Sequence, residues 1–174
     1  MPHTSFAATA IRCLAALGLA VLPSTVLAQD AQATFVDQSG NEIGAATLTA
    51  TDGGVLLRVE INGLPPRSWV GFHVHEIGTC DPASQHESAG DHFNPSGVEH
   101  GFLTDTGPHA GDMPNLWVDD AGVARAEVFN PFILLAEGQN SVLGRALMIH
   151  ADPDDHASQP SGDAGERLAC AVIG

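Results

Sequence analysis

Residues 55–62 alternate between apolar and polar side chains, as a β-strand with one buried face requires. Side chains two positions apart in a strand point to the same face, so one face would hold the apolar residues Val55, Leu57, Val59 and Ile61. Arg58 and Glu60 are expected on the opposite face, in contact with solvent. The pattern therefore predicts a half-buried strand over Val55–Asn62.

The same period of two recurs along the chain, and glycine-containing segments at 37–41, 51–54 and 119–122 separate the apolar stretches at hairpin distance. The predicted strands are Ala33–Val36, Ile43–Ala50, Val55–Asn62, Ser68–His75, Leu116–Val118, Val123–Phe129, Arg145–His150 and Ala169–Ile173. No segment has the apolar period of a convincing amphipathic helix. Several short strands joined by glycine-rich turns predict an all-β fold, either a sandwich or a Greek-key barrel.

Two long segments, residues 76–115 and 151–168, interrupt this rhythm. Loops of this length are uncommon in a compact domain unless something other than secondary structure holds them. The first contains His86, His92, His100, His109 and Asp112, and the second begins directly after His150 and ends just before Cys170. Bound metal is one constraint that such a composition could supply.

The first 28 residues have the pattern of a secretory signal. Met1–Arg12 carries one positive charge and no acid, Cys13–Leu22 is an unbroken apolar run, and Val26–Ala28 offers small or apolar residues for cleavage. An apolar run of about ten residues is too short for a transmembrane helix, which takes about 20. We therefore expect an exported protein, periplasmic or extracellular, without a membrane anchor, whose single domain is residues 29–174.

Removal of the signal leaves Cys80 and Cys170, and two cysteines in an oxidising compartment suggest one disulfide. Residues 29–174 hold 5 arginines, no lysine and 21 acidic side chains, which gives them a formal charge of −16. A charge of this sign makes nucleic acid and anionic membranes poor partners. A requirement for solubility alone would account for most of this excess of acidic side chains.

Histidines at strand ends and in the first loop form two candidate metal sets. His73 and His75 are two residues apart on a predicted strand, so one metal ion can take both imidazoles, and His150 can supply a third nitrogen. Imidazole-rich ligation suits copper(II), whereas three histidines and one carboxylate at tetrahedral angles suit zinc. The loop offers that second set in His92, His100, His109 and Asp112. The remaining histidines are interpreted as solvated loop residues (His86 and His156) or as part of the signal (His3).

Five segments of the chain resemble the signature stretches of copper-zinc superoxide dismutases. They are GFHVHE at 71–76, SAGDHFNP at 88–95, HAGDMPN at 109–115, MIHADPDD at 148–155 and GERLACAVIG at 165–174. They occur in the family's order and span nearly all of residues 29–174. The resemblance, to the exported bacterial type of the family, implies an eight-stranded Greek-key β-barrel of immunoglobulin-like sandwich architecture with two long functional loops.

The resemblance also implies a role for each candidate residue. Copper would be held by His73, His75, His92 and His150, and zinc by His92, His100, His109 and Asp112, so that His92 bridges the two metals. Asp154 would accept hydrogen bonds from His73 and His100 and fix the two rings. Cys80 and Cys170 would form an intrasubunit disulfide, and Arg167 would receive the anion beside copper.

The activity implied by the resemblance is disproportionation of superoxide to oxygen and hydrogen peroxide, with copper and zinc as cofactors. Copper would change oxidation state, His92 would carry a proton, and zinc would act structurally and electrostatically. Two alternatives from other classes are a non-catalytic copper and zinc buffer or carrier, and a barrel that its metals only stabilise. Residues 151–166 contain five acids and no lysine or arginine, which predicts weak long-range steering of superoxide. Both a monomer and a homodimer are compatible with the sequence.

Overall fold

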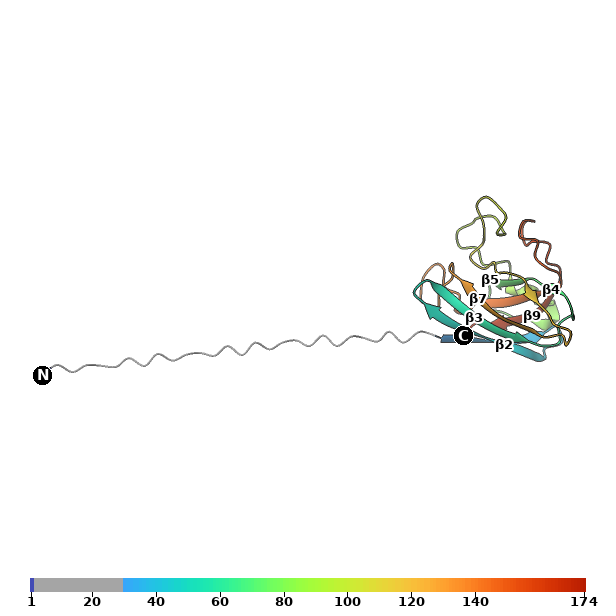
Figure 1. The fold of residues 1–174 in the computed structure, drawn as a ribbon, viewed down its shortest axis with the longest axis horizontal. Helices are drawn as coiled ribbons and strands as arrows, with labels where there is room; N and C mark the ends of the chain where they lie inside the picture. The colour runs from blue at the N-terminus through green and yellow to red at the C-terminus, as the bar shows by residue number, and fades with distance from the viewer. Residues whose placement is uncertain (2–29) are drawn as a thin grey trace.

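The computed structural model of the protein describes Met1 and residues 30–174, so the predicted signal lies outside the described residues apart from Met1 (Figure 1). The strands are β1 (Asp30–Asp37), β2 (Glu42–Thr51), β3 (Gly54–Ile61), β4 (Trp69–Val70), β5 (Phe72–His75), β6 (Leu116–Trp117), β7 (Ala124–Asn130), β8 (Ala146–His150) and β9 (Arg167–Val172). Two short 3₁₀ turns, η1 (Pro82–Ser84) and η2 (Glu87–Ala89), lie in the first long loop.

Seven of the strands form one antiparallel sheet in the order β5-β8-β9-β1-β2-β3-β7, and β4 pairs with β6 in a small second sheet. The first strand, β1, pairs with both β2 and the last strand, β9. An isolated bridge between Val118 and Ala124 connects the end of β6 to β7. The predicted all-β fold is confirmed, and the curled sheet has the Greek-key barrel architecture.

The predicted strand Ser68–His75 is divided in the structure into β4 and β5, with Gly71 between them. The backbone of Gly71 makes two hydrogen bonds of 2.9 Å. Its N–H donates to the carbonyl of Asp152 in the second long loop, and its carbonyl accepts from the N–H of His150 at the end of β8. A Cβ at this position would lie 3.0 Å from Cβ of Ala164. The absence of a side chain at Gly71 thus lets residues 151–168 lie against the barrel beside β5.

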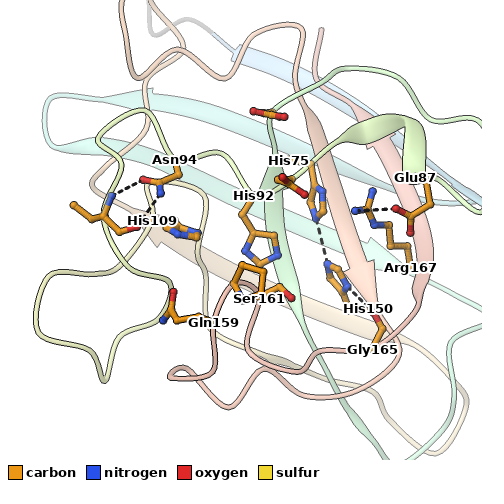
Figure 2. Close-up of a pocket in the computed structure, with 14 residues that line it drawn as sticks. His75, Glu87, His92, Asn94, His109, His150, Gln159, Ser161, Gly165 and Arg167 are labelled. Carbon is orange, nitrogen blue, oxygen red and sulfur yellow. Dashed lines mark hydrogen bonds and ion pairs between the residues drawn. The ribbon is translucent and has the colours of Figure 1, made fainter.

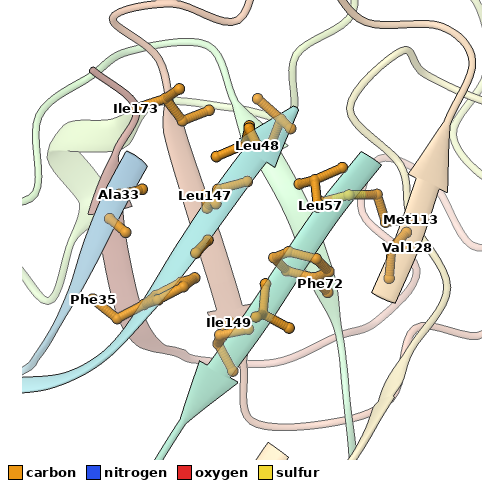
Figure 3. Packing of buried hydrophobic residues seen from close by; sticks show 14 of the residues in the cluster. Ala33, Phe35, Leu48, Leu57, Phe72, Met113, Val128, Leu147, Ile149 and Ile173 are labelled. Atoms are coloured by element: carbon orange, nitrogen blue, oxygen red, sulfur yellow. The ribbon is translucent and has the colours of Figure 1, made fainter. Parts of the chain in front are cut away.

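The barrel interior is filled by apolar side chains of all the long strands (Figure 3). Buried members include Ala33, Phe35, Leu48, Leu57, Phe72, Met113, Val128, Leu147, Ile149 and Ile173. In β5, Phe72 and Val74 belong to this core, so the period-two geometry of a strand turns His73 and His75 away from it. Core packing on one face of β5 therefore fixes where the two imidazoles emerge.

A second, smaller apolar cluster lies on the outer side of β8 and β9. It contains Ala89, Ala146, Met148 and Cys170, with Cys80 packed against them. Cys80 and Cys170 form a disulfide with their Cα atoms 5.5 Å apart, which confirms the predicted bridge. The bridge ties the start of the first long loop to β9.

Across residues 30–174, the structure has no helix with the length and apolar character needed to cross a membrane.

Candidate metal centre

Strands β5 and β8 bring three of the predicted copper ligands together. The two strands are antiparallel neighbours, with His73 opposite Met148 and His75 opposite Ala146, and β8 ends at His150. Nε2 of His75 lies 3.3 Å from Nε2 of His150. His92 joins them from the first long loop through a β-bridge to His75 (Figure 2). One ring nitrogen from each of the four histidines lies within 4.8 Å of the others.

Hydrogen bonds at the outer nitrogens orient three of these rings. Nδ1 of His75 donates to the carbonyl of Gly90 at 2.8 Å, and Nδ1 of His150 lies 3.3 Å from the carbonyl of Gly165. Each contact leaves Nε2 directed toward the other histidines. His73 is reversed, because its Nε2 is bonded at 2.7 Å to Asp154 and its Nδ1 points inward. An orienting partner of this kind fixes which nitrogen of a histidine is available to a metal.

The second set, His92, His100, His109 and Asp112, is gathered around one carboxylate oxygen. Oδ1 of Asp112 lies 3.1 Å from Nδ1 of His92, 3.0 Å from Nδ1 of His100 and 3.4 Å from Nδ1 of His109. Oδ2 accepts backbone hydrogen bonds from Gly101 and His109, both at 2.9 Å. These backbone bonds hold the carboxylate in place and leave Oδ1 among the three imidazoles.

His92 belongs to both sets, with Nδ1 facing Asp112 and Nε2 facing the other set. Nε2 of His92 and Nδ1 of His73 are buried and have no hydrogen-bond partner among the described residues. Leaving such groups unpaired costs about 1–3 kcal/mol each, and coordination of a metal would satisfy them. The donor chemistry fits the predicted metals: four imidazoles suit copper(II), and three imidazoles with one carboxylate suit zinc.

Asp154 connects the two sets from the second long loop. Its Oδ2 accepts from Nε2 of His73 at 2.7 Å and its Oδ1 from Nε2 of His100 at 3.0 Å. Asn115 holds the backbone of Asp154 with two hydrogen bonds of 2.8 Å. Gly162 packs so closely that a Cβ there would overlap the Asp154 carboxylate and lie 2.7 Å from Nε2 of His100. Sequence reasoning did not identify Asn115 or Gly162, because Asn115 acts by bonding the backbone of Asp154 and Gly162 acts through its lack of a side chain.

Burial controls the protonation of the first set. Burial lowers the pKa of His73 to about 4 and holds the pKa of His75 and of His150 well below 6.5. These rings are therefore neutral at pH 7, which is the form that binds a metal. His100 behaves differently: burial opposes its charge, but hydrogen bonds to Asp112 and Asp154 raise its pKa to about 9. The same contacts lower the pKa of both carboxyl groups despite their burial.

Arg167 lines the same pocket as His75, His92 and His150, as Figure 2 shows. Its guanidinium Nη1 donates to the carbonyl of His86 at 3.0 Å, and Nη2 lies 3.4 Å from Oε2 of Glu87. Of the residues predicted for the metal centre, the structure places five on this pocket: His75, His92, His109, His150 and Arg167. The other four, His73, His100, Asp112 and Asp154, belong to the same clusters of potential ligand atoms. Glu87 was not among the predicted residues, because an exposed acid in an acidic chain gives no local signal.

The interpretation of His86 as a solvated residue is wrong. Its side chain is fully buried, and burial lowers its pKa. The loop around it folds back on itself, with the N–H of His86 bonded to the carbonyl of Asp81 and the N–H of Ala89 bonded to the carbonyl of His86. His156 is also less exposed than expected, with 23% of its side chain accessible, because it packs beside Asp154 and the Phe102 ring.

Residues 42–173 match the family model described as copper/zinc superoxide dismutase (SODC). The chain is 48% identical over 160 residues to superoxide dismutase [Cu-Zn] 1 of Aquifex aeolicus, covering 88% of this chain and 94% of that protein. It is 40% identical over 140 residues to superoxide dismutase [Cu-Zn] of Caulobacter vibrioides, covering 77% and 79% of the two chains.

Solved structures give the same result for the fold. A SOD-like protein from Bacillus subtilis superposes with a TM-score of 0.77 at 35% identity, covering 80% of this chain and 95% of that one. The clock protein EA4 superposes with a TM-score of 0.71 at 33% identity, covering 88% and 99% of the two chains. With the family model spanning most of the described residues, the chain belongs to the copper/zinc superoxide dismutase family.

Proposed function

We propose that the protein disproportionates superoxide, converting two superoxide anions and two protons into oxygen and hydrogen peroxide. Copper would be held by His73, His75, His92 and His150, and zinc by His92, His100, His109 and Asp112. The observation that carries the proposal is that two complete donor sets lie side by side and share the single ring of His92. Family membership supports the same activity.

Bound copper supplies one-electron redox chemistry and zinc supplies a fixed positive charge. The protein residues position the ions, control protons and admit the substrate. His73, His75 and His150 present neutral nitrogens, because burial keeps their pKa values low. His92 can hold a proton on Nε2 while Nδ1 stays beside Asp112, so it is suited to deliver that proton to the forming peroxide.

Arg167 is suited to bind the anionic substrate at the pocket. Its guanidinium lies on the same pocket as the first histidine set, and only 13% of its side chain is exposed. A positive charge that is partly withdrawn from water attracts an anion more strongly than a fully solvated one. Together, His92 and Arg167 would supply the proton and the anion-binding charge.

A test of this function needs metal content and turnover from the same sample. We expect purified protein reconstituted with both metals to contain one copper and one zinc per chain and to remove superoxide catalytically. The alternative, a non-catalytic copper and zinc buffer or carrier with this barrel, predicts both metals with no turnover. Absence of both metals after reconstitution would contradict both functions.

The protein is proposed to act outside the cytoplasm, in the periplasm or extracellular space. The Cys80–Cys170 disulfide supports an oxidising compartment, and the apolar run over residues 13–22 supports a cleaved secretory signal. Residues 29–174 would then be the mature domain, as a monomer or a homodimer. Mass spectrometry of the exported protein would locate the cleavage site, and sedimentation velocity would distinguish the two assemblies.

A further inference from the structure

Both terminal nitrogens of the Arg167 guanidinium are engaged by neighbouring residues of the first long loop. Nη1 donates to the carbonyl of His86, and Nη2 pairs with the carboxylate of Glu87 at 3.4 Å. The carbonyl contact only positions the guanidinium, because a carbonyl carries no net charge. The carboxylate contact is different, since it brings a negative charge to the side chain that is proposed to receive an anion.

The two partners of this ion pair differ in their freedom to move. The Glu87 side chain is 69% exposed and that of Arg167 is 13% exposed. Arg167 is also held through its backbone, because Nε2 of Gln38 donates to its carbonyl at 2.9 Å. Glu87 is therefore the partner that can swing into solvent, and Arg167 is the one that stays. An approaching anion would have to displace the Glu87 carboxylate or bind in its field.

The backbone around His86 places the Glu87 side chain beside Arg167. Glu87 directly follows His86, whose fully buried side chain anchors the turn that begins η2. Since the carbonyl of His86 binds Arg167, the next side chain along the loop lies close to the same guanidinium. Glu76 and Asp91 line the same pocket, but within residues 30–174 the only carboxylate that pairs with Arg167 is that of Glu87.

We propose that Glu87 is a positioning residue that limits anion capture, because its carboxylate competes with superoxide for the Arg167 guanidinium. This inference rests on the proposed function. A carboxylate about 6 Å from a bound anion repels it by an amount that depends strongly on local solvent, and the exposure of Glu87 weakens that repulsion. We therefore expect Glu87→Gln to raise kcat/KM about twofold to tenfold at low ionic strength.

The kinetic test compares substitutions that remove one negative charge at different places. Glu76→Gln removes a charge from a residue that lines the same pocket but forms no ion pair with Arg167 among the described residues. Glu42→Gln removes an exposed charge at the start of β2. Glu87→Gln should give the largest increase in kcat/KM, and Glu87→Asp, which keeps the charge, should stay close to the wild type. The increase should shrink as salt is raised from about 10 to 300 mM, because salt screens partly exposed charges.

A second readout does not depend on turnover. Phenylglyoxal has to reach the guanidinium nitrogens to form bonds with them, and the Glu87 carboxylate, paired with Nη2 of Arg167 at 3.4 Å, obstructs that approach. Arg167 should therefore be modified about twofold to tenfold faster in Glu87→Gln than in the wild type, measured by peptide mass in both metal-free and metal-loaded protein. Arg58, which is paired with Glu127, provides an internal reference because its partner is unchanged.

Two results would overturn the inference: equal increases in kcat/KM from Glu76→Gln and Glu87→Gln, or an unchanged modification rate of Arg167. Failure of the proposed function gives a different pattern. If the protein has no dismutase turnover, the kinetic arm shows no activity in any variant. Faster modification of Arg167 in Glu87→Gln would then show the ion pair to exist while contradicting its role in superoxide capture.

Discussion

Asp154 accepts a hydrogen bond of 2.7 Å from Nε2 of His73, and neither side chain is exposed to solvent. The other oxygen of Asp154 accepts from Nε2 of His100 at 3.0 Å. One carboxylate thus orients a histidine in each donor set, and it does so through oxygens that both accept. This pairing requires two acceptors, which an amide does not have.

Asp154→Asn is therefore expected to weaken metal binding. The amide oxygen can accept from one ring, but the amide nitrogen then faces the N–H of the other ring, and two donors cannot pair. Loss of an orienting partner of a ligand typically costs about 10–100-fold in metal affinity. Competition with chelators should show this loss for at least one metal. Asp163→Asn, an exposed acid in the same loop, should leave both affinities unchanged, and equal effects of the two substitutions would contradict the role of Asp154.

His100→Ala should lose zinc and retain copper. His100 has its Nδ1 beside Asp112 and belongs to the second donor set but not to the first. His109→Ala offers a matched variant, because His109 also belongs only to the second set and makes no contact with Asp154 among those described. Elemental analysis after reconstitution should find about one copper and little zinc in both. Loss of copper alone in either variant would reverse the assignment.

The Cys80–Cys170 disulfide should contribute strongly to stability. It closes a loop with a sequence separation of 90 residues, for which the chain-entropy model gives about 4–5 kcal/mol. For a domain of this size, that corresponds to a fall in Tm of about 10–20 °C on reduction. Calorimetry with and without a reductant would measure the change. Two free thiols per chain in the native exported protein would contradict the bridge.

The metal-free protein should lose stability as pH falls from about 6.5 to 4. His73 has its pKa lowered by burial from 6.5 to about 4, so in this range the unfolded chain binds a proton that the folded chain does not. His73 alone then removes about 3 kcal/mol of unfolding free energy, and buried His75 and His150 act in the same direction.

His100 gives the opposite dependence at higher pH. Its pKa is raised to about 9, so its contribution is complete below 6.5 and is lost as pH rises toward 9. Urea unfolding of metal-free protein should therefore give the highest midpoint near pH 6.5 and lower midpoints at about pH 4.5 and pH 9. A midpoint that does not change on acidification over this range would show that the three buried histidines are not neutral in the folded state.

The strands were predictable because alternation along the chain reflects burial on one face. The prediction over Val55–Asn62 agrees with β3 to within one residue at each end. The division at Gly71 was not visible, because it results from hydrogen bonds to Asp152 and His150, which lie far away in sequence. A pattern confined to neighbouring residues cannot report a contact that another loop imposes.

The donor residues were also predictable in type, because histidines two apart on a strand and three histidines with one aspartate in a loop match the ligands that copper(II) and zinc take. The supporting contacts were not. Glu87 and Arg167 are 80 residues apart, and nothing in their local sequence indicates that their side chains meet. His86 was misread for a related reason: its burial depends on how a disulfide-anchored loop folds back, and a lone loop histidine has no periodic neighbours to reveal it.

Arg167→Ile should reduce kcat/KM by a few-fold to about a hundredfold. A unit charge about 6 Å from a bound anion contributes roughly 0.7 kcal/mol in water and nearly 3 kcal/mol at an effective dielectric of about 20, and each 1.4 kcal/mol is about tenfold in rate. Arg167 is mostly withdrawn from solvent, with 13% of its side chain exposed. That burial favours a loss of kcat/KM in the upper half of this range. The nearby Glu87 carboxylate acts in the other direction, because it offsets part of the charge of Arg167 and so reduces the expected loss. Pulse radiolysis or a competition assay would measure the change.

The salt dependence shows which field controls capture. Residues 29–174 carry a formal charge of −16, which repels superoxide at long range, whereas Arg167 and the bound metals attract it at the pocket. If the local field dominates, added salt slows the wild type, and Arg167→Ile weakens that dependence. If the acidic surface dominates, added salt speeds the reaction instead, because screening removes repulsion. An Arg167→Ile variant within twofold of the wild type and with the same salt slope would show that Arg167 does not guide the anion.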